Sequence, residues 1–315
     1  MSEQNNEAPS YAEVADPAKP TDVTSTPKHV SAPSNVTGPS SSVSSLGKQL
    51  DRAILRLNQV ISTPGGLNSF LSTFNYTLYI LAYLQTTHSH TIKRHARTLL
   101  VLLNYGRSKP DATILVTDAG AVPPVAALAG LISRARTTLR LFGLFPLYAW
   151  LKALLKGKKE GEDPVLHRVA LLQCISYIVY QALENIAVLG DNGVLSPSTI
   201  SRFNKGDSTT TRIYLWAYRA WLAGVTCDFL SLARRAQREK EKREKRGSAS
   251  QEEIEEDRKT DSGWWREFVV AAAWFPMALH YSGEKGIPGW NLGWLGVTGW
   301  VAGLGRTKGY WDATA

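Results

Sequence analysis

Cysteine is scarce in this sequence, since Cys174 and Cys227 are the only two among 315 residues. Two isolated cysteines cannot form a disulfide framework and are typical of a protein from a reducing compartment. The sequence also lacks CxxC, HExxH and clustered Cys/His patterns, so we expect no metal site and no cofactor. No nucleophile, carboxylate pair or glycine-rich phosphate loop accompanies its six histidines, so an enzyme is the least supported class of function.

Large apolar residues are few in residues 1–45, which are instead rich in Ser, Thr, Pro and Asn. Such a segment cannot bury enough apolar surface to offset the conformational entropy lost on folding, so we expect a disordered tail. It also has no basic segment followed by an apolar run, and we expect no secretory signal peptide there. If the chain reaches a membrane, we expect it to do so through internal segments.

Helical periodicity is what the rest of the chain does contain, starting at Leu46. Over residues 46–61 the apolar side chains recur every three or four positions, and the opposite face is basic. This helix either packs its apolar face into a bundle core or lies on a membrane surface. On a membrane surface, the inserting residues are Leu50, Ile54 and Leu57, and the residues that bind lipid headgroups are Arg52 and Arg56.

A second basic amphipathic helix is predicted between Gly130 and Lys159, with a kink or break at Pro146. Large apolar residues line one face and arginines the other, the pattern of a helix that lies in a membrane interface. The residues assigned to insertion are Leu131, Leu139, Phe142 and Phe145, and those assigned to anionic lipid headgroups are Arg134, Arg136 and Arg140. A partner groove for basic helices, or a packed helix with a solvated basic face, would use the same pattern.

Three further helices are expected over residues 67–87, 165–189 and 213–246. The first is uncharged and long enough to span a membrane, but its polar half leaves open whether it spans or packs in a bundle. The second contains Glu184 within an apolar run, which favours a helix packed among other helices. The third is aromatic and then highly charged. Its basic residues lack the interleaved aromatics that stack on bases, so no nucleic-acid partner is expected.

The last part of the chain is rich in glycine and tryptophan. After a charged linker, residues 247–263, two apolar stretches at 264–281 and 287–304 are separated by a short turn. Glycines four residues apart let helices approach closely in lipid, which predicts a membrane hairpin over residues 264–311; a short buried hairpin in a soluble protein is the alternative. The glycines assigned to packing of this span are Gly289, Gly293, Gly296, Gly299 and Gly303. Basic residues at both ends of the hairpin place both termini in the cytosol.

These patterns together predict an all-α, membrane-associated helical bundle with basic amphipathic helices and a C-terminal glycine-rich membrane hairpin. We divide the chain into a disordered tail (1–45), a helical membrane-remodelling region (46–246), a charged linker (247–263) and the hairpin (264–311).

Four stretches resemble a known family, in the same order along the chain. They are STPGGLNSFLSTFNYTLYILAYL (62–84), SRARTTLRLFG (133–143), YQALENIAVLGDNGVL (180–195) and the final PMALHYS with the glycine-rich stretch after it. From Asp51 to Trp311 the sequence resembles the peroxisomal biogenesis factor 11 (peroxin-eleven) family of peroxisomal membrane proteins. Its longer tail and charged segment suggest a divergent, fungal-type member.

The resemblance implies a peroxisomal membrane protein of peroxisome elongation, proliferation and fission. Three functions follow as hypotheses: a membrane-remodelling protein that binds anionic lipids and self-associates, a channel or transporter for small metabolites, and an adaptor that recruits dynamin-type fission machinery. Polar residues between 69 and 77, together with Glu184 and Asn185, motivate the channel. The first hypothesis agrees best with the residues, because an amphipathic helix inserted in one leaflet expands that leaflet and bends the bilayer.

Overall fold

The computed structural model describes residues 43–103, 124–158 and 161–314. Within these residues the chain forms helices and no strand, which confirms the all-α prediction. The helices are α1 (Val43–Ile61), α2 (Pro64–Leu103), α3 (Pro124–Arg140), α4 (Leu144–Leu155), α5 (Pro164–Asp191), α6 (Pro197–Phe203), α7 (Thr211–Arg246), α8 (Gln251–Ser282) and α9 (Leu292–Asp312). The tail predicted for residues 1–45 lies outside the described residues up to residue 42.

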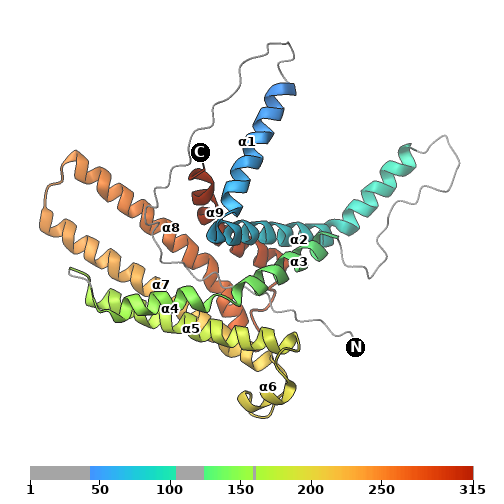
Figure 1. The fold of residues 1–315 in the computed structure, drawn as a ribbon. Helices are drawn as coiled ribbons and strands as arrows, with labels where there is room; N and C mark the ends of the chain where they lie inside the picture. The colour runs from blue at the N-terminus through green and yellow to red at the C-terminus, as the bar shows by residue number, and fades with distance from the viewer. Residues whose placement is uncertain (1–42, 104–123, 159–160, 315) are drawn as a thin grey trace, which may run out of the picture.

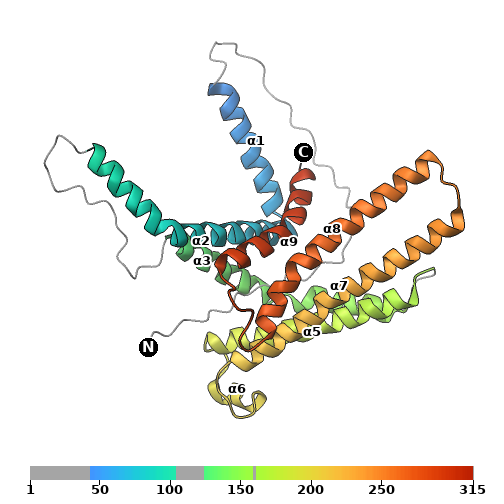
Figure 2. The ribbon, with the colours of Figure 1, turned by 180° about the vertical axis from the view of Figure 1, so that it is seen from behind.

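The helices form two groups (Figure 1). In the first group α5 lies between α4 and α7, and α8 runs back along α7 as a long hairpin. In the second group α9 and α3 both pack against α2, and α1 projects away from them. Helix α8 joins the two groups, because its C-terminal half leads into α9 through residues 283–291 (Figure 2).

Local sequence determines where α5 begins. Asp163 caps the helix, since its Oδ1 accepts hydrogen bonds from the backbone N–H groups of Val165 at 2.8 Å and Leu166 at 3.1 Å. Pro164 occupies the first helical position, where its missing N–H removes no bond. Arg234 of α7 donates a 2.8 Å hydrogen bond to the other carboxylate oxygen of Asp163. This charged hydrogen bond is the largest cause that lowers the pKa of Asp163, to about 2, so the capping residue stays ionised.

Aromatic side chains fill the core where α5, α7 and α8 meet. The ring centroid of Trp221 lies 6.3 Å from that of Tyr180 and 6.0 Å from that of Trp274. Tyr76 of α2 reaches the same cluster, with its centroid 6.0 Å from that of Trp274. Tilted and edge-on ring contacts stabilise such a cluster beyond the burial of its area. The core is therefore shared by the two groups of helices.

Two helices extend beyond the boundaries that the sequence predicts. Residues 67–87 belong to one longer helix, α2, which continues to Leu103. Residues 251–263, predicted as a linker, form the first part of α8. The reason is local, because Ser250 and Glu253 make a reciprocal capping box that starts a helix here.

The break between α3 and α4 falls at residues 141–143, just before the predicted position. The backbone N–H groups of these residues bond three residues back instead of four, and the axes of the two helices differ by 44°. Because α4 begins at Leu144, Pro146 lies in its first turn, where a missing N–H costs no hydrogen bond within the helix.

Candidate functional site

An exposed row of large apolar side chains runs along α3 and α4. The four residues predicted to insert into a membrane are all exposed: Leu131, Leu139, Phe142 and Phe145. Phe142 exposes 64% of its surface and Phe145 exposes 72%. Three further apolar residues of the two helices are also exposed: Leu128, Tyr148 and Leu155. An uncovered apolar surface of this kind is typical of a site that contacts a membrane or a partner.

Two arginines of the same motif point the other way, into the protein. Arg136 exposes only 1% of its surface and donates a 2.9 Å hydrogen bond to the Ser72 hydroxyl of α2. Its guanidinium also lies 5.5 Å from the ring centroid of Tyr76. Arg134, by contrast, remains exposed. Helix α3 therefore turns two of its three arginines inward and its large apolar side chains outward, largely the reverse of an amphipathic helix in water.

Arg140 forms a buried, bidentate ion pair with Glu184 of α5. Its Nε and Nη2 atoms donate to Oε2 and Oε1 of the carboxylate at 3.0 and 3.1 Å. Tyr180 donates a 2.8 Å hydrogen bond to the same carboxylate, and the Asn185 amide donates to the Leu141 carbonyl at 3.0 Å. These bonds hold the turn between α3 and α4 against α5.

The predicted role of Arg136 and Arg140 at lipid headgroups therefore does not fit this conformation, because both guanidinium groups are bound inside the protein. Periodicity separates two faces of a helix but does not say which face meets the rest of the chain. One signal in the sequence pointed to the partner. Glu184 stands in an apolar run, and a carboxylate there is stable only when a buried cation pairs with it.

The same reversed polarity extends along α5 and the first half of α2. The buried polar residues of these helices are Ser69, Ser72, Asn75, Gln173, Ser176, Gln181 and Glu184. Their exposed apolar residues are Phe74, Leu81, Leu84, Leu172, Ile175 and Val179. In lipid, apolar side chains face outward and polar side chains find partners in the bundle interior. This distribution therefore suits a lipid environment better than water.

Among the described residues, one helix is long and apolar enough by itself to cross a membrane, and it is α5. Helices α3 and α4 pass the same test as a bent pair, which is the geometry of a broken span or a re-entrant segment. The described residues of α8 and α9, where the hairpin was predicted, do not pass it.

The glycine-rich face of α9 is covered by α2. The glycines on this face are Gly293, Gly296, Gly299 and Gly303. A Cβ atom added at Gly296 would lie 2.7 Å from Cγ1 of Ile80, so only glycine permits this approach. Gly289 differs from the others, because it lies in the loop before α9 with φ of +78°. The face expected to support self-association is thus occupied within the chain.

Helix α1 repeats part of the pattern of α3. Its Leu50 and Ile54 are exposed, while Leu57 is partly buried. Of its two arginines predicted at headgroups, Arg52 is exposed. Arg56 instead donates a 2.7 Å hydrogen bond to the carbonyl of Trp311 and lies over the ring of that residue, 4.4 Å from its centroid. Arg56 therefore fastens the end of α9 to α1.

The sequence of this chain matches the model of one protein family. The model of the family described as peroxisomal biogenesis factor 11 (PEX11) matches residues 115–305, well over half of the chain. No curated protein and no solved structure matches the chain. The matched range contains the exposed apolar row of α3 and α4 together with Arg136, Arg140 and Glu184. The chain belongs to the PEX11 family.

Proposed function

We propose that this protein promotes peroxisome elongation and fission by inserting α3 and α4 into the cytosolic leaflet of the peroxisomal membrane and bending it. Members of the PEX11 family are peroxisomal and act in peroxisome proliferation and division, and the family is one of biogenesis factors and not an enzyme family. Insertion and bending are the steps that we add. The exposed apolar row of α3 and α4 is the observation that supports them.

Burial of this row in lipid supplies the energy of insertion. Moving one large side chain such as Phe145 from water into an apolar medium contributes about 1.5–3 kcal/mol, so several together favour insertion strongly. Helices α3 and α4 have 17 and 12 residues and meet at a 44° bend. Such a short, bent pair fits a shallow position better than a straight span. Shallow insertion expands one leaflet. The bilayer then bends so that the expanded leaflet lies on the convex side.

The buried network gives the inserted pair a fixed support. The Arg140–Glu184 ion pair joins the end of α3 to α5, whose length and outer apolar side chains suit an anchor in the bilayer. A pair of helices fixed to an anchor holds its depth and angle, so its insertion bends the bilayer in one direction. Exposed Arg134 and Arg52 remain available to anionic headgroups. The cytosolic position of both termini stays a prediction of the charge pattern.

Vesicle tubulation by the purified full-length protein tests the proposal. The variant Phe145→Glu places a charge in the exposed row without touching the core, and a carboxylate in the apolar part of a bilayer is costly. We expect tubulation to be lost and the folded state to be retained. In cells that lack the protein, this variant should leave peroxisomes few and enlarged, whereas the unchanged protein should restore their number.

Ile254→Glu is the matched control. Ile254 is an exposed apolar residue of α8, on the charged hairpin with α7 and away from α3 and α4. This variant should tubulate vesicles as the unchanged protein does. Normal tubulation by Phe145→Glu, or equal loss in both variants, would contradict insertion through α3 and α4.

A further inference from the structure

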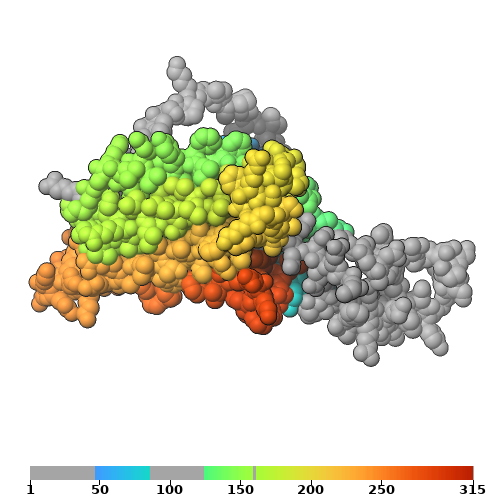
Figure 3. Space-filling model, turned by 90° about the horizontal axis from the view of Figure 1, so that it is seen from below, coloured from blue at the N-terminus to red at the C-terminus, as the bar shows by residue number. Residues whose placement is uncertain are grey.

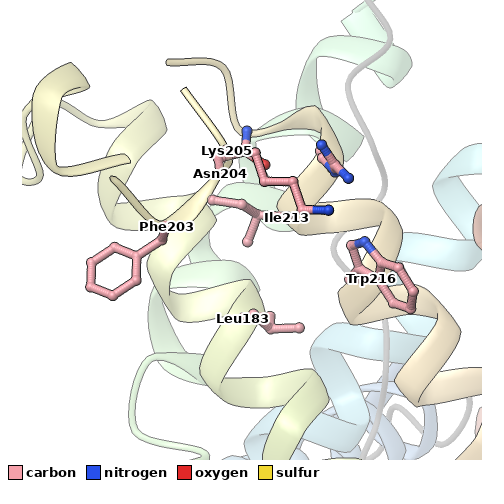
Figure 4. Close-up of a pocket in the computed structure, with 7 residues that line it drawn as sticks. Leu183, Phe203, Asn204, Lys205, Ile213 and Trp216 are labelled. Atoms are coloured by element: carbon pink, nitrogen blue, oxygen red, sulfur yellow. The ribbon is translucent and has the colours of Figure 1, made fainter. Parts of the chain in front are cut away.

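We propose that a pocket between α5, α6 and α7 binds an anionic phospholipid of the membrane. The pocket has a volume of about 350 Å³ and opens where the loop after α6 passes the start of α7 (Figure 4). It is separate from the apolar row of α3 and α4. The inference rests on the proposed membrane insertion, because a lipid must be within reach of the pocket.

The floor of the pocket is apolar. Leu183 of α5 and Ile213 of α7 line it, and Trp216 of α7 forms one wall with 52% of its surface exposed. Phe203, at the end of α6, exposes 73% of its surface beside the same opening. Exposed aromatic residues around an apolar floor suit a ligand whose body is apolar and whose surroundings are partly wet.

The rim of the pocket is positively charged. Lys205 and Arg212 line it, and neither side chain makes a hydrogen bond or ion pair with any residue that the structure describes. No carboxylate is among the lining residues. Arg212 interacts electrostatically with Asp207, whose carboxylate also accepts hydrogen bonds from the N–H and hydroxyl of Thr209 at 2.8 and 3.0 Å. Two cations above an apolar floor fit an amphiphilic anion.

The backbone at Lys205 gives a second reason. Lys205 has φ of +54° and is the only residue other than glycine with positive φ in the described part of the chain. It follows Asn204, the residue at the end of α6, in the position where glycine usually terminates a helix without strain. A side chain there carries a conformational cost. Figure 4 shows Lys205 beside Ile213 of α7, so the residue with the strained backbone is one that lines the pocket.

The residues around the pocket favour a membrane lipid as the molecule that supplies the anion. The aromatic pair Phe203 and Trp216, next to two cations, has the composition of residues that lie at the headgroup level of a bilayer. Seen from below, α6 lies at the end of the layer of α4 and α5, with α7 and α8 beside them on the same side of the molecule (Figure 3). The pocket at the end of α6 therefore lies beside the layer whose α4 is proposed to enter the bilayer.

Flotation of the full-length protein with two kinds of vesicle separates this pocket from the proposed insertion. Vesicles of phosphatidylcholine alone report the apolar row. Added phosphatidylserine reports the pocket together with the exposed Arg134 and Arg52, and variants of the pocket separate its share. We expect Lys205→Gln with Arg212→Gln to lower binding to the mixed vesicles about thirty-fold, or about 2 kcal/mol for two cations. Binding to phosphatidylcholine should not change. The control, Lys240→Gln with Lys245→Gln on the exposed part of α7, removes the same charge and should bind mixed vesicles normally.

The variant Lys205→Gly distinguishes a role of Lys205 in lipid binding from a role in the stability of the fold. Glycine adopts positive φ without strain, so this variant should unfold at a higher temperature and yet bind the mixed vesicles more weakly. Equal loss in the control double variant, or full binding by the pocket variants, would overturn the pocket. Failure of the unchanged protein to bind phosphatidylcholine would instead contradict insertion of α3 and α4.

Titration of inorganic phosphate and of oleate into the protein without vesicles tests the other source. We expect neither to bind tightly. Tight binding of either one that is lost in Lys205→Gln with Arg212→Gln would assign the pocket to a soluble anion and overturn the assignment to a membrane lipid.

Discussion

The layer formed by α3, α4 and α5 and the hairpin formed by the distal parts of α7 and α8 are built in opposite ways. In the layer, Arg140 and Glu184 are enclosed and Phe142 and Phe145 are exposed. In the hairpin, most ion pairs are exposed, although Arg246 and Asp257 are largely covered. Trp264 is turned inward and donates a 2.9 Å hydrogen bond to the carbonyl of Leu232. One chain therefore carries one region suited to lipid and one suited to water.

The two ion pairs show what this difference means in energy. Arg140 and Glu184 expose 11% and 1% of their side chains, whereas Arg243 and Asp261 of the hairpin expose 31% and 54%. An enclosed pair whose partner is removed leaves an uncompensated charge out of water. An exposed pair that is broken returns both charges to water at little cost. The same chemistry at similar distance should therefore have very different effects on stability in the two regions.

Removal of the Glu184 charge should have the largest effect. Glu184→Gln leaves Arg140 charged and enclosed, and we expect the free energy of unfolding to fall by about 3–5 kcal/mol. Thermal unfolding of the full-length protein in detergent, followed by circular dichroism, measures the change. The double variant Arg140→Met with Glu184→Gln has no uncompensated charge and should recover most of the loss. A double variant as unstable as the single one would mean that the charge is not the cause.

The seam between α9 and α2 should come next, because it depends on backbone approach and not on charge. A Cβ atom in Gly299→Ala would overlap the ring of Tyr76, which belongs to the shared core. Overpacking of this kind costs about 1–3 kcal/mol. Gly305→Ala in the same helix meets no atom and should raise stability by up to about 1 kcal/mol through helix propensity. Equal melting temperatures for the two variants would contradict the close packing of α9 on α2.

The positions of the helices could be predicted from the sequence, but not which face of each helix turns toward the protein. Periodicity and capping residues located α1, α5 and α7 within a few residues, because both signals are local. Which face of α3 meets the protein depends on Ser72 and Glu184, which lie 64 and 44 positions from the arginines they bind. A local sequence pattern covers too few residues to predict contacts between positions so far apart. The polar composition of 251–263 predicts a linker, whereas the capping box of Ser250 and Glu253 is a local signal that starts a helix there.

The pocket at Lys205 could not be predicted from the sequence either, because its residues come from separate segments of the chain. Its apolar floor comes from α5 and α7, and its cations come from the loop after α6 and the start of α7. Each of these residues is ordinary in its own segment. Only the fold brings them together, and only the backbone angle at Lys205 marks the loop as unusual.

The smallest effect should come from breaking the exposed ion pair of the hairpin. Arg243→Gln removes the 2.8 Å contact with Asp261 and the longer contacts with Glu239 and Asp257 at 3.4 and 3.5 Å. We expect a loss of no more than about 1 kcal/mol, since Asp257 keeps its pair with Arg246 and water solvates Asp261. Salt separates the two regions further. The Debye length falls to about 3 Å at 1 M ionic strength, so high salt should abolish the small deficit of Arg243→Gln and leave the deficit of Glu184→Gln in place. The readout is the melting temperature of each variant at low and high salt. A deficit for Arg243→Gln that is large and indifferent to salt would mean that the hairpin, too, is shielded from water, and the two regions would then not differ in the solvent they are built for.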